Sequence, residues 1–520
     1  MIREISRRKC LRLWLCKPEY MGRTKWENRF VLLRFRKKNY MMFLKDLKRF
    51  KMERLYDKLK AYSESDFYAF HMPGHKRNKA LLGIELPYDL DITEIDGFDD
   101  LHHADGILKE EQERAARVFG AEESHFLVNG STAGILSAVM GCTHRGDKIL
   151  VARHCHKSIY HAIYMNGLVP RYVYPEFDIS MHMNGEISKE DVAKALAAEP
   201  DIKAVVIVSP NYDGVVSDVK GIAEVAHSYR IPLIVDEAHG PHFGFHPAFP
   251  GRANDLGADV VINSLHKTLP SLTQTAILHI NGKLANRRRI KKYLDMLQSS
   301  SPSYIFMASL DACVDFLDGK CEEAFELYVE RLQKFREELK PLQHLQILRT
   351  EHYDISKVVI STANANITSP ELAERLRKEY HLEMEMTGGT YVLAMTTVAD
   401  TQEGLDRLKA ALLEIDGQLE AKTAVSGSIE ISGELPRLEQ YFTPQEAADR
   451  EEDGEEIPWK ESEGHISLEY AYLYPPGSPV IVPGERISRE AVELLCYYET
   501  QNLQIEGIQT EGKIKVWKHE

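Results

Sequence analysis

The sequence predicts an α/β protein whose main domain contains a mostly parallel sheet with helices on both faces. Short apolar runs rich in Val and Ile, such as 203–210 and 231–236, have the composition of strands buried on both faces. These runs alternate with amphipathic helical segments, and this βαβ order favours a parallel sheet. A second, smaller α/β unit follows from about residue 321, so the 520 residues are expected to form more than one domain.

Four segments are expected along the chain. They are a basic extension over 1–51, an N-terminal arm followed by a large domain built on the parallel sheet over 52–320, a small α/β domain over 321–420 and a C-terminal domain over 421–520. The extension carries 17 Lys and Arg against 4 Asp and Glu, and it has no clean helical or strand period. Our hypothesis is that it arises from a misplaced start codon and that Met52 is the true start, which mass spectrometry of the native N-terminus would test.

The composition limits the class of partner. Without the extension, the chain carries 48 Lys and Arg against 75 Asp and Glu, a balance that suits a small cationic substrate and argues against nucleic acid. The seven cysteines form no CxxC pair, which fits a reducing cytoplasm and no structural zinc site. No apolar run reaches about 18 residues, so a membrane span is not expected.

Two polar segments precede the predicted sheet. FYAFHMPGHKRN (67–78) has the composition of a loop, and its two histidines are too few for a metal site, so no metal is expected. The acidic segment 88–106 offers Glu94, Asp99 and Asp100 as candidates for binding a cationic group. Solvated surface acids are the alternative explanation.

The first strand–helix pair of the sheet carries a possible phosphate site. FLVNGSTAGILSAVMGC (126–142) runs from a strand into an apolar helix, with Gly130, Ser131 and Thr132 at the junction. Backbone N–H groups and hydroxyls at a helix start bind phosphate. The alternative is that Ser131 or Thr132 only caps the helix.

The next strand is expected over 148–153, and His156 follows it at the start of a helix. Its ring could stack on a flat cofactor, or it could be an ordinary buried and hydrogen-bonded histidine. Ser188 is expected to cap the helix over 188–199. In the small domain, Ser369 is expected to cap the helix over 369–380, between strands at 356–364 and 390–398.

Two further strands end in residues of a chemically specific kind. IPLIVDEAHG (231–240) ends with Asp236, and DVVINSLHKT (259–268) ends with Ser264, His266 and Lys267. Because parallel strands end at one edge of a sheet, an acid and a lysine face one cleft. The pair suits pyridoxal 5′-phosphate, whose aldehyde forms a Schiff base with a lysine and whose ring nitrogen is kept protonated by an aspartate. An unrelated acid and a solvated lysine are the alternative.

Together these residues resemble the Orn/Lys/Arg decarboxylase family, short bacterial form, within the aspartate-aminotransferase-like fold of PLP-dependent enzymes. The resemblance covers roughly residues 55–500, and it implies that 52–320 contains the large PLP-binding domain and that 421–520 is the C-terminal decarboxylase domain. The stretches that carry it are HMPGHK (71–76), DITEIDGFDDLH (91–102), FLVNGST (126–132), HCHKS (154–158), VDEAHG (235–240), SLHKT (264–268) and YPPGSPVIVPGE (474–485).

The resemblance implies a role for each site residue. Lys267 binds the cofactor covalently, Asp236 pairs with its ring nitrogen, and His156 stacks on its ring. Further cofactor contacts are implied for Gly130, Ser131, Thr132, Ala238, His239, Ser264 and His266. The resemblance also implies a homodimer or higher homo-oligomer with the active site at the interface, so that the loops 71–76 and 91–102 would serve the partner's site.

The predicted reaction is α-decarboxylation of arginine, lysine or ornithine to the amine and CO2, as in polyamine-type metabolism. Lys267 or His266 would return the proton to the product. Two alternatives stay open: a non-catalytic PLP-binding protein, and an aminotransferase of the same fold. An aminotransferase usually needs an arginine that binds the substrate carboxylate, for which Arg153 and Arg252 are candidates. No residue can be assigned to reading which basic amino acid is bound.

Overall fold

The computed structural model describes residues 54–81, 83–178, 183–422, 434–473, 477–500 and 503–518. The expectations for residues 1–51, including the start-codon hypothesis, lie outside this set. Residues Arg54–Glu520 form one compact unit. Nowhere in the described ranges does a helix combine the length and apolar composition that a bilayer crossing requires.

A seven-stranded sheet organises the first half of this unit, and its order is β1-β9-β8-β7-β6-β2-β3. The pairs β8–β7, β7–β6, β6–β2 and β2–β3 are parallel, whereas β9 is antiparallel to both of its neighbours. The prediction of a mostly parallel sheet is therefore confirmed. The strands are β1 Glu123–Leu127, β2 Lys148–Ala152, β3 Val169–Val173, β6 Val205–Val208, β7 Leu233–Asp236, β8 Val260–Asn263 and β9 Ala276–Ile280.

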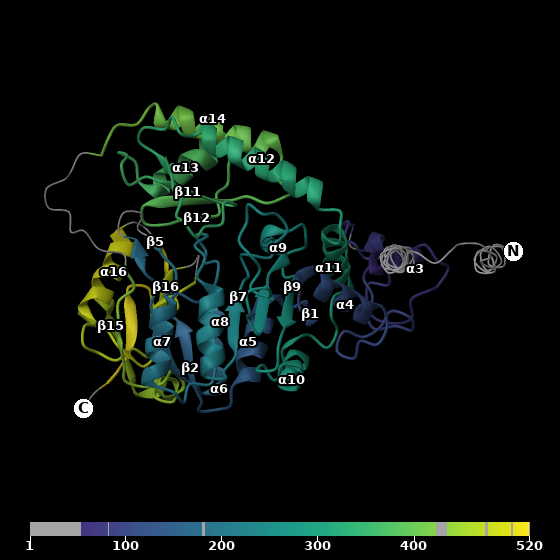
Figure 1. The fold of residues 1–520 in the computed structure, drawn as a ribbon, viewed down its shortest axis with the longest axis horizontal. Helices are drawn as coiled ribbons and strands as arrows, with labels where there is room; N and C mark the ends of the chain where they lie inside the picture. The colour runs from purple at the N-terminus through teal and green to yellow at the C-terminus, as the bar shows by residue number, and fades with distance from the viewer. Residues whose placement is uncertain are drawn as a thin grey trace, which may run out of the picture. The chain divides into compact units, whose positions relative to one another are not determined.

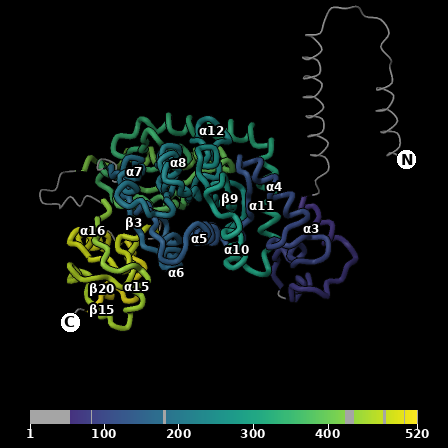
Figure 2. Tube along the Cα trace, turned by 60° about the horizontal axis from the view of Figure 1, so that its bottom comes forward, coloured from purple at the N-terminus to yellow at the C-terminus, as the bar shows by residue number. Residues whose placement is uncertain are grey.

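Helices cover both faces of this sheet, as Figure 2 shows, with α5, α6 and α10 together on one side and α7 and α8 on the other. Strands β6, β7 and β8 are buried along their whole length, which explains why they read as unbroken apolar runs. The helices of this part are α4 Ile107–Phe119, α5 Gly130–Cys142, α6 Lys157–Asn166, α7 Lys189–Ala198, α8 Val219–Ser228, α9 Leu265–Thr268, α10 Arg287–Leu297 and α11 Tyr304–Leu317.

A second sheet has four antiparallel strands in the order β10-β11-β13-β12. In Figure 1 the helices α12, α13 and α14 lie on the outer side of these strands. The elements are α12 Glu322–Glu338, β10 Gln346–Ile347, β11 Lys357–Ser361, α13 Ser369–Tyr380, β12 Met386–Thr387, β13 Tyr391–Met395 and α14 Gln402–Asp416.

The predicted helix caps differ in outcome. Ser188 caps α7, since its side chain accepts a hydrogen bond from the Asp191 N–H, as expected. The expectation for Ser369 is wrong, because Thr368 is the cap residue of α13 and Ser369 is already helical. Thr368 and Glu371 form a reciprocal capping box, and Pro370 occupies the first turn, where a missing N–H costs nothing.

The C-terminal part is built from short strands and one longer helix around its own small core. Its strands pair as β14–β18, β15–β20 and β17–β16–β19. The elements are β14 Glu439–Gln440, α15 Pro444–Ala448, β15 Gly454–Pro458, β16 Ala471–Leu473, β17 Pro479–Ile481, β18 Glu485–Arg486, α16 Arg489–Thr500, β19 Ile505–Glu506 and β20 Lys513–Trp517.

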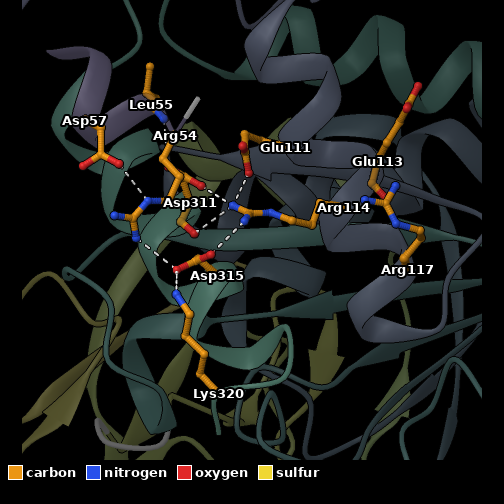
Figure 3. A network of polar contacts seen from close by, with 10 residues as sticks. All are labelled: Arg54, Leu55, Asp57, Glu111, Glu113, Arg114, Arg117, Asp311, Asp315 and Lys320. Atoms are coloured by element: carbon orange, nitrogen blue, oxygen red, sulfur yellow. Dashed lines mark hydrogen bonds and ion pairs between the residues drawn. The ribbon is translucent and has the colours of Figure 1, made fainter. Parts of the chain in front are cut away.

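A buried charge network joins the first described helix, α3 Leu55–Ser63, to α4 and α11 (Figure 3). Arg114 on α4 pairs with Glu111 and with Asp311 on α11. Asp311 also accepts the backbone N–H of Leu55 at 3.0 Å, so a buried carboxylate fixes the start of α3. A charge this deeply buried persists because it is paired.

Candidate active site

Asp236 and Lys267 come together at the carboxyl edge of the large sheet. Asp236 is the last residue of β7, and Lys267 lies in α9, which directly follows the neighbouring parallel strand β8. Burial raises the pKa of Asp236, and the nearby charge of Lys267 acts in the opposite direction. The backbone N–H of Ala238 donates to the Asp236 carboxylate at 3.2 Å, which orients it. The structure therefore brings the predicted acid and lysine into one site.

His239 stands between two lysines. Its Nε2 lies 2.8 Å from Lys267 Nζ, and its Nδ1 lies 3.0 Å from Nζ of Lys357, the first residue of β11. The ring of Tyr212 packs against the imidazole with the ring centroids 4.6 Å apart. Burial, and then the charges of both lysines, lower the pKa of His239 well below its usual value, so the ring is neutral. Lys357 was not singled out by the sequence, because it opens a strand like many surface lysines.

The amines of both lysines have lowered pKa values. Burial lowers the pKa of Lys267, against the charges of Asp236 and Glu385. Burial likewise lowers the pKa of Lys357 to about 8, against the charges of Asp354, Glu385 and Asp213. A lysine with a lowered pKa holds more of its amine in the neutral, nucleophilic form near pH 7.

Two unsatisfied donor sets mark the place for an anion. The Asn129 cap of α5 makes no side-chain capping bond, so the N–H groups at the start of this helix are left to other partners. Ser131 and Thr132 lie inside the first turn of α5, which rules out the cap role considered for them. Ser264 is fully buried, and its hydroxyl has no hydrogen-bond partner within the described residues. A buried hydroxyl without a partner is costly unless a ligand completes it.

The glycine before this turn is required by the backbone. Gly130 has φ of +72°, which side-chain-bearing residues rarely adopt. Its N–H donates to the carbonyl of Gln274 at 3.0 Å, and the Gln274 side chain donates to the Val128 carbonyl at 2.7 Å. Gln274 thus holds the loop that presents Ser131 and Thr132. The sequence carried no signal for this role, because the two segments are distant along the chain.

His156 caps α6, and its side chain accepts a hydrogen bond from the Ser158 N–H. Burial, and then the charge of Lys267, lower its pKa to about 4, which identifies a neutral ring close to the lysine. His266 Nδ1 lies 2.9 Å from the carbonyl oxygen of Thr275. A carbonyl only accepts, so Nδ1 carries the proton and the neutral ring has no N–H left on Nε2.

The carboxylates of the acidic segment 88–106 differ in their partners and in their exposure to solvent. Asp99 accepts backbone N–H groups from Asp100, Asp105, Gly106 and Leu108 at 2.9–3.0 Å, so its carboxylate fixes the start of α4. This saturation argues against Asp99 as a substrate ligand. Asp100 accepts the His102 N–H at 2.8 Å and pairs with His103, whereas Glu94 is exposed.

Neither arginine considered for an aminotransferase is available. Arg153 is fully buried and is bound to Glu485, to the carbonyls of Pro479 and Val480 and to the Tyr160 hydroxyl. Arg252 pairs with Asp255 at 2.8 Å and donates to the Val118 carbonyl at 2.7 Å. Both arginines hold the fold together, which removes the support for the aminotransferase alternative.

These groups fit pyridoxal phosphate. The first turn of α5 and Ser264 provide donors for a phosphate, Lys267 provides an amine for an aldehyde, and Asp236 provides a buried carboxylate for a ring nitrogen. The described residues contain no cluster of three His, Cys, Asp or Glu side chains that would suit a metal ion.

This chain is similar to known proteins in both sequence and fold. A model of the Orn/Lys/Arg decarboxylase major domain matches residues 53–422, and a model of the C-terminal domain of that family matches residues 434–512. An arginine decarboxylase of Bacillus subtilis (strain 168) is 34% identical over 469 residues, which cover 87% of this chain and 95% of that protein. An arginine decarboxylase of Bacillus anthracis is 32% identical over 485 residues, which cover 89% and 97%.

The solved structure of the constitutive lysine decarboxylase of E. coli matches with a TM-score of 0.77 and 21% sequence identity. The match covers 96% of this chain and 86% of that chain, and at this identity it shows a common fold. The two family models together span most of the described residues, and the bacillary relatives match over nearly their whole length. The chain therefore belongs to the Orn/Lys/Arg decarboxylase family, and it is a carboxy-lyase.

Proposed function

We propose that this protein is a PLP-dependent decarboxylase that converts arginine to agmatine and CO2 in preference to lysine or ornithine. The observation that carries the proposal is the placement of Lys267 beside the buried Asp236 at the ends of two adjacent parallel strands. The preference for arginine is supported by the bacillary relatives, which are named arginine decarboxylases and are 32–34% identical.

When bound, pyridoxal phosphate supplies an electron-accepting ring that takes up the electron pair released as CO2 leaves. Lys267 would hold the cofactor carbon, Asp236 the ring nitrogen, and Ser131, Thr132 and Ser264 the phosphate. His156 would pack on the ring. Ala238 orients Asp236 through its N–H, and His239 holds the Lys267 amine.

Lys267 is the group that we assign to returning the proton. The neutral His266 has its one N–H directed at the Thr275 carbonyl, so its Nε2 can accept a proton and cannot donate one. Within the described part of the chain the Lys267 amine makes no hydrogen bond to a carbonyl, and its contact with His239 connects it to a second titratable group.

Glu94 is our candidate for the guanidinium of arginine. It is exposed on the loop between α3 and α4, whereas the Asp99 carboxylate is saturated by backbone donors. A carboxylate can accept two parallel hydrogen bonds from a guanidinium, which an ammonium cannot match.

A homodimer is supported by the surface of the same arm. Phe67, Tyr68, Phe70 and Met72 are between 64% and 89% exposed within one short stretch. A cluster of exposed apolar side chains of this kind is unusual on a free surface and suits burial against a second copy. Light scattering of the purified protein tests it, and a monomer at micromolar concentration would contradict it.

A cytoplasmic location is supported by the cysteines, because Cys142, Cys155, Cys313, Cys321 and Cys496 are all free thiols. The amine product would then enter polyamine-type metabolism in the same compartment.

The deciding experiment supplies arginine, lysine and ornithine separately to the protein loaded with pyridoxal phosphate. Equal amounts of CO2 and agmatine from arginine are expected, with slower release from the other two. Transfer of the amino group to a keto acid without CO2 would instead identify an aminotransferase. Asp236→Ala should greatly lower turnover, and full activity of this variant would refute the role of Asp236.

A further inference from the structure

The imidazole of His239 has a lysine amine at each of its nitrogens, at 2.8 Å and 3.0 Å. An ammonium group has three donors and no acceptor, and a neutral imidazole has one donor and one acceptor. The ring can therefore accept from one ammonium only, and the other lysine must accept from the ring N–H as a neutral amine. A protonated ring would donate at both nitrogens and would need both lysines neutral.

We propose that Lys357 is a positioning residue that acts through His239 on Lys267, so that the two lysines share one proton and Lys267 is held as a neutral amine. This inference deepens the proposed function and rests on it for its purpose, because a neutral Lys267 is the form that attacks a carbonyl carbon.

Two segments of the fold fix the position of Lys357. The loop after β6 and the segment before β11 are joined by hydrogen bonds, from the Asp354 N–H to the Gly214 carbonyl at 2.8 Å and from the Val216 N–H to the His352 carbonyl at 3.0 Å. Gly214 has φ of +105°, and a Cβ there would lie 2.7 Å from Cγ of Lys357. The stem of the lysine thus lies against a glycine that leaves it just enough room.

The carboxylates around Lys357 favour it as the residue that carries the charge. Asp354, Glu385 and Asp213 all act on Lys357, from the segment before β11, the segment before β12 and the loop after β6. Asp354 is itself held by His242, Nε2 to Oδ1 3.1 Å, and by the Ser356 hydroxyl at 2.7 Å. The ring of Tyr212 lies 5.9 Å from Lys357 Nζ, and Arg336 and Tyr353 bind the Lys357 carbonyl rather than its amine.

Fewer acids act on Lys267 than on Lys357. Asp236 and Glu385 favour its charged form, and the charge of Lys267 in turn acts on the neutral rings of His156, His239 and His266. In the proposed arrangement the shared proton is on Lys357 in the cofactor-free protein, and the single proton of His239 is on Nε2 and is directed at Lys267.

The same arrangement can return a proton to Lys267. One N–H bond of Lys357 breaks as a bond forms at His239 Nδ1, while the Nε2–H bond breaks as one forms at Lys267 Nζ. The three side chains carry a single positive charge before and after this shift. Lys357 ends as the neutral amine and Lys267 as the ammonium, which is the form needed to protonate a product.

The test uses the cofactor-free protein, so that it is independent of turnover. The protein is treated with a trace of an amine-acetylating reagent from pH 6 to pH 10.5, and the acetylated fraction of each lysine is measured by mass spectrometry of its peptides. Lys409, which pairs with Glu338 and Asp406 at 2.7 and 2.9 Å, is the reference within each sample. The Lys267 midpoint should lie at least one pH unit below that of Lys409, and equal midpoints in the wild type would overturn the proposal.

The variant Lys357→Met removes the neighbouring charge and frees His239 Nδ1 to carry the proton, so that Lys267 can donate to Nε2 as an ammonium. In this variant the acetylation of Lys267 relative to Lys409 at pH 7.5 should fall roughly tenfold. The rate at which added pyridoxal phosphate forms the visible Schiff base should fall similarly. Lys357→Arg, which keeps the charge, should restore the wild-type labelling midpoint. Lys340→Met, which removes an exposed lysine paired with Glu337 at 2.7 Å, is the matched control and should change neither readout.

Unchanged Lys267 labelling in a folded Lys357→Met protein would overturn the proposal, even if arginine is decarboxylated. A shifted labelling curve in a protein that releases no CO2 from arginine, lysine or ornithine would support the link between the lysines and refute the proposed function alone. If Lys357→Met does not fold, Lys357→Leu removes the same charge and hydrogen bond and is judged by the same two outcomes.

Discussion

Arg153 and Glu485 form a fully buried ion pair, Nη2 to Oε2 3.0 Å, between residues that lie 332 positions apart in the chain. Arg153 follows β2 of the large sheet, and Glu485 begins β18 of the C-terminal part. Arg153 also donates to the carbonyls of Pro479 and Val480 at 2.9 and 3.0 Å. One side chain thus attaches the C-terminal part to the sheet that carries the active site.

Arg153→Met should lower the free energy of unfolding by roughly 3–5 kcal/mol, because it leaves the Glu485 carboxylate buried without its partner. Urea unfolding followed by circular dichroism measures the loss. The double variant Arg153→Met with Glu485→Leu removes both charges and should recover part of the stability. A double variant as unstable as the sum of the two single variants would show that the pair is not the cause.

Lys267→Ala should abolish both CO2 release and the visible absorption of the bound cofactor, because it removes the amine assigned to the Schiff base. Spectra of the dialysed protein and a CO2 assay with arginine measure the two losses. Lys409→Ala removes a lysine whose partners are Glu338 and Asp406 and should leave both signals unchanged. Wild-type turnover in Lys267→Ala would contradict the assigned role.

Ser264→Ala should weaken binding of pyridoxal phosphate by roughly 10- to 100-fold, because a hydrogen bond to a charged group contributes about 1.5–3 kcal/mol. Equilibrium dialysis against pyridoxal phosphate gives the dissociation constant. The control is Ser137→Ala on α5, since the hydroxyl of Ser137 is likewise buried without a partner among the described residues. Equal effects of the two substitutions would argue against a phosphate contact at Ser264.

Asp99→Ala should destabilise the fold by about 1–2 kcal/mol without a specific effect on the KM for arginine, because this carboxylate satisfies the N–H groups at the start of α4. Glu94→Gln should raise the KM for arginine with little change in unfolding free energy. Steady-state kinetics and urea unfolding of both variants separate the two roles. A raised KM for Asp99→Ala alone would reverse the assignment.

Glu237 should make the fold less stable as the pH rises. Burial raises its pKa to about 8 in the folded protein, from an ordinary value near 4.5. A carboxyl group whose pKa is raised by folding contributes most below its unfolded pKa, and this contribution is lost as the pH rises toward the folded pKa. The free energy of unfolding should fall by roughly 3–4 kcal/mol between pH 5 and pH 8 on account of this group. Glu237→Gln should flatten that part of the profile, and an unchanged slope would contradict the shift.

Local sequence patterns were sufficient for the buried strands and for the placement of Asp236 and Lys267 in one site. Buried parallel strands are continuous apolar runs, so β6, β7 and β8 are recognisable in the sequence. Because such strands end at one edge of the sheet, Asp236 and Lys267 could be assigned to one cleft without coordinates. The error at Ser369 was local as well, since adjacent Thr and Ser both suit a helix cap and only the backbone shows which residue is the cap.

The sequence by itself determined the family, the main sheet and the lysine–aspartate pair, because each follows from residues close together in the chain and from the edge rule of parallel sheets. Only the tertiary structure decided that Arg153 is structural and that Lys357 reaches His239. The physical reason is that these two roles depend on partners supplied by distant segments. A buried charge is defined by the groups that pair with it, and those groups are brought together only by folding.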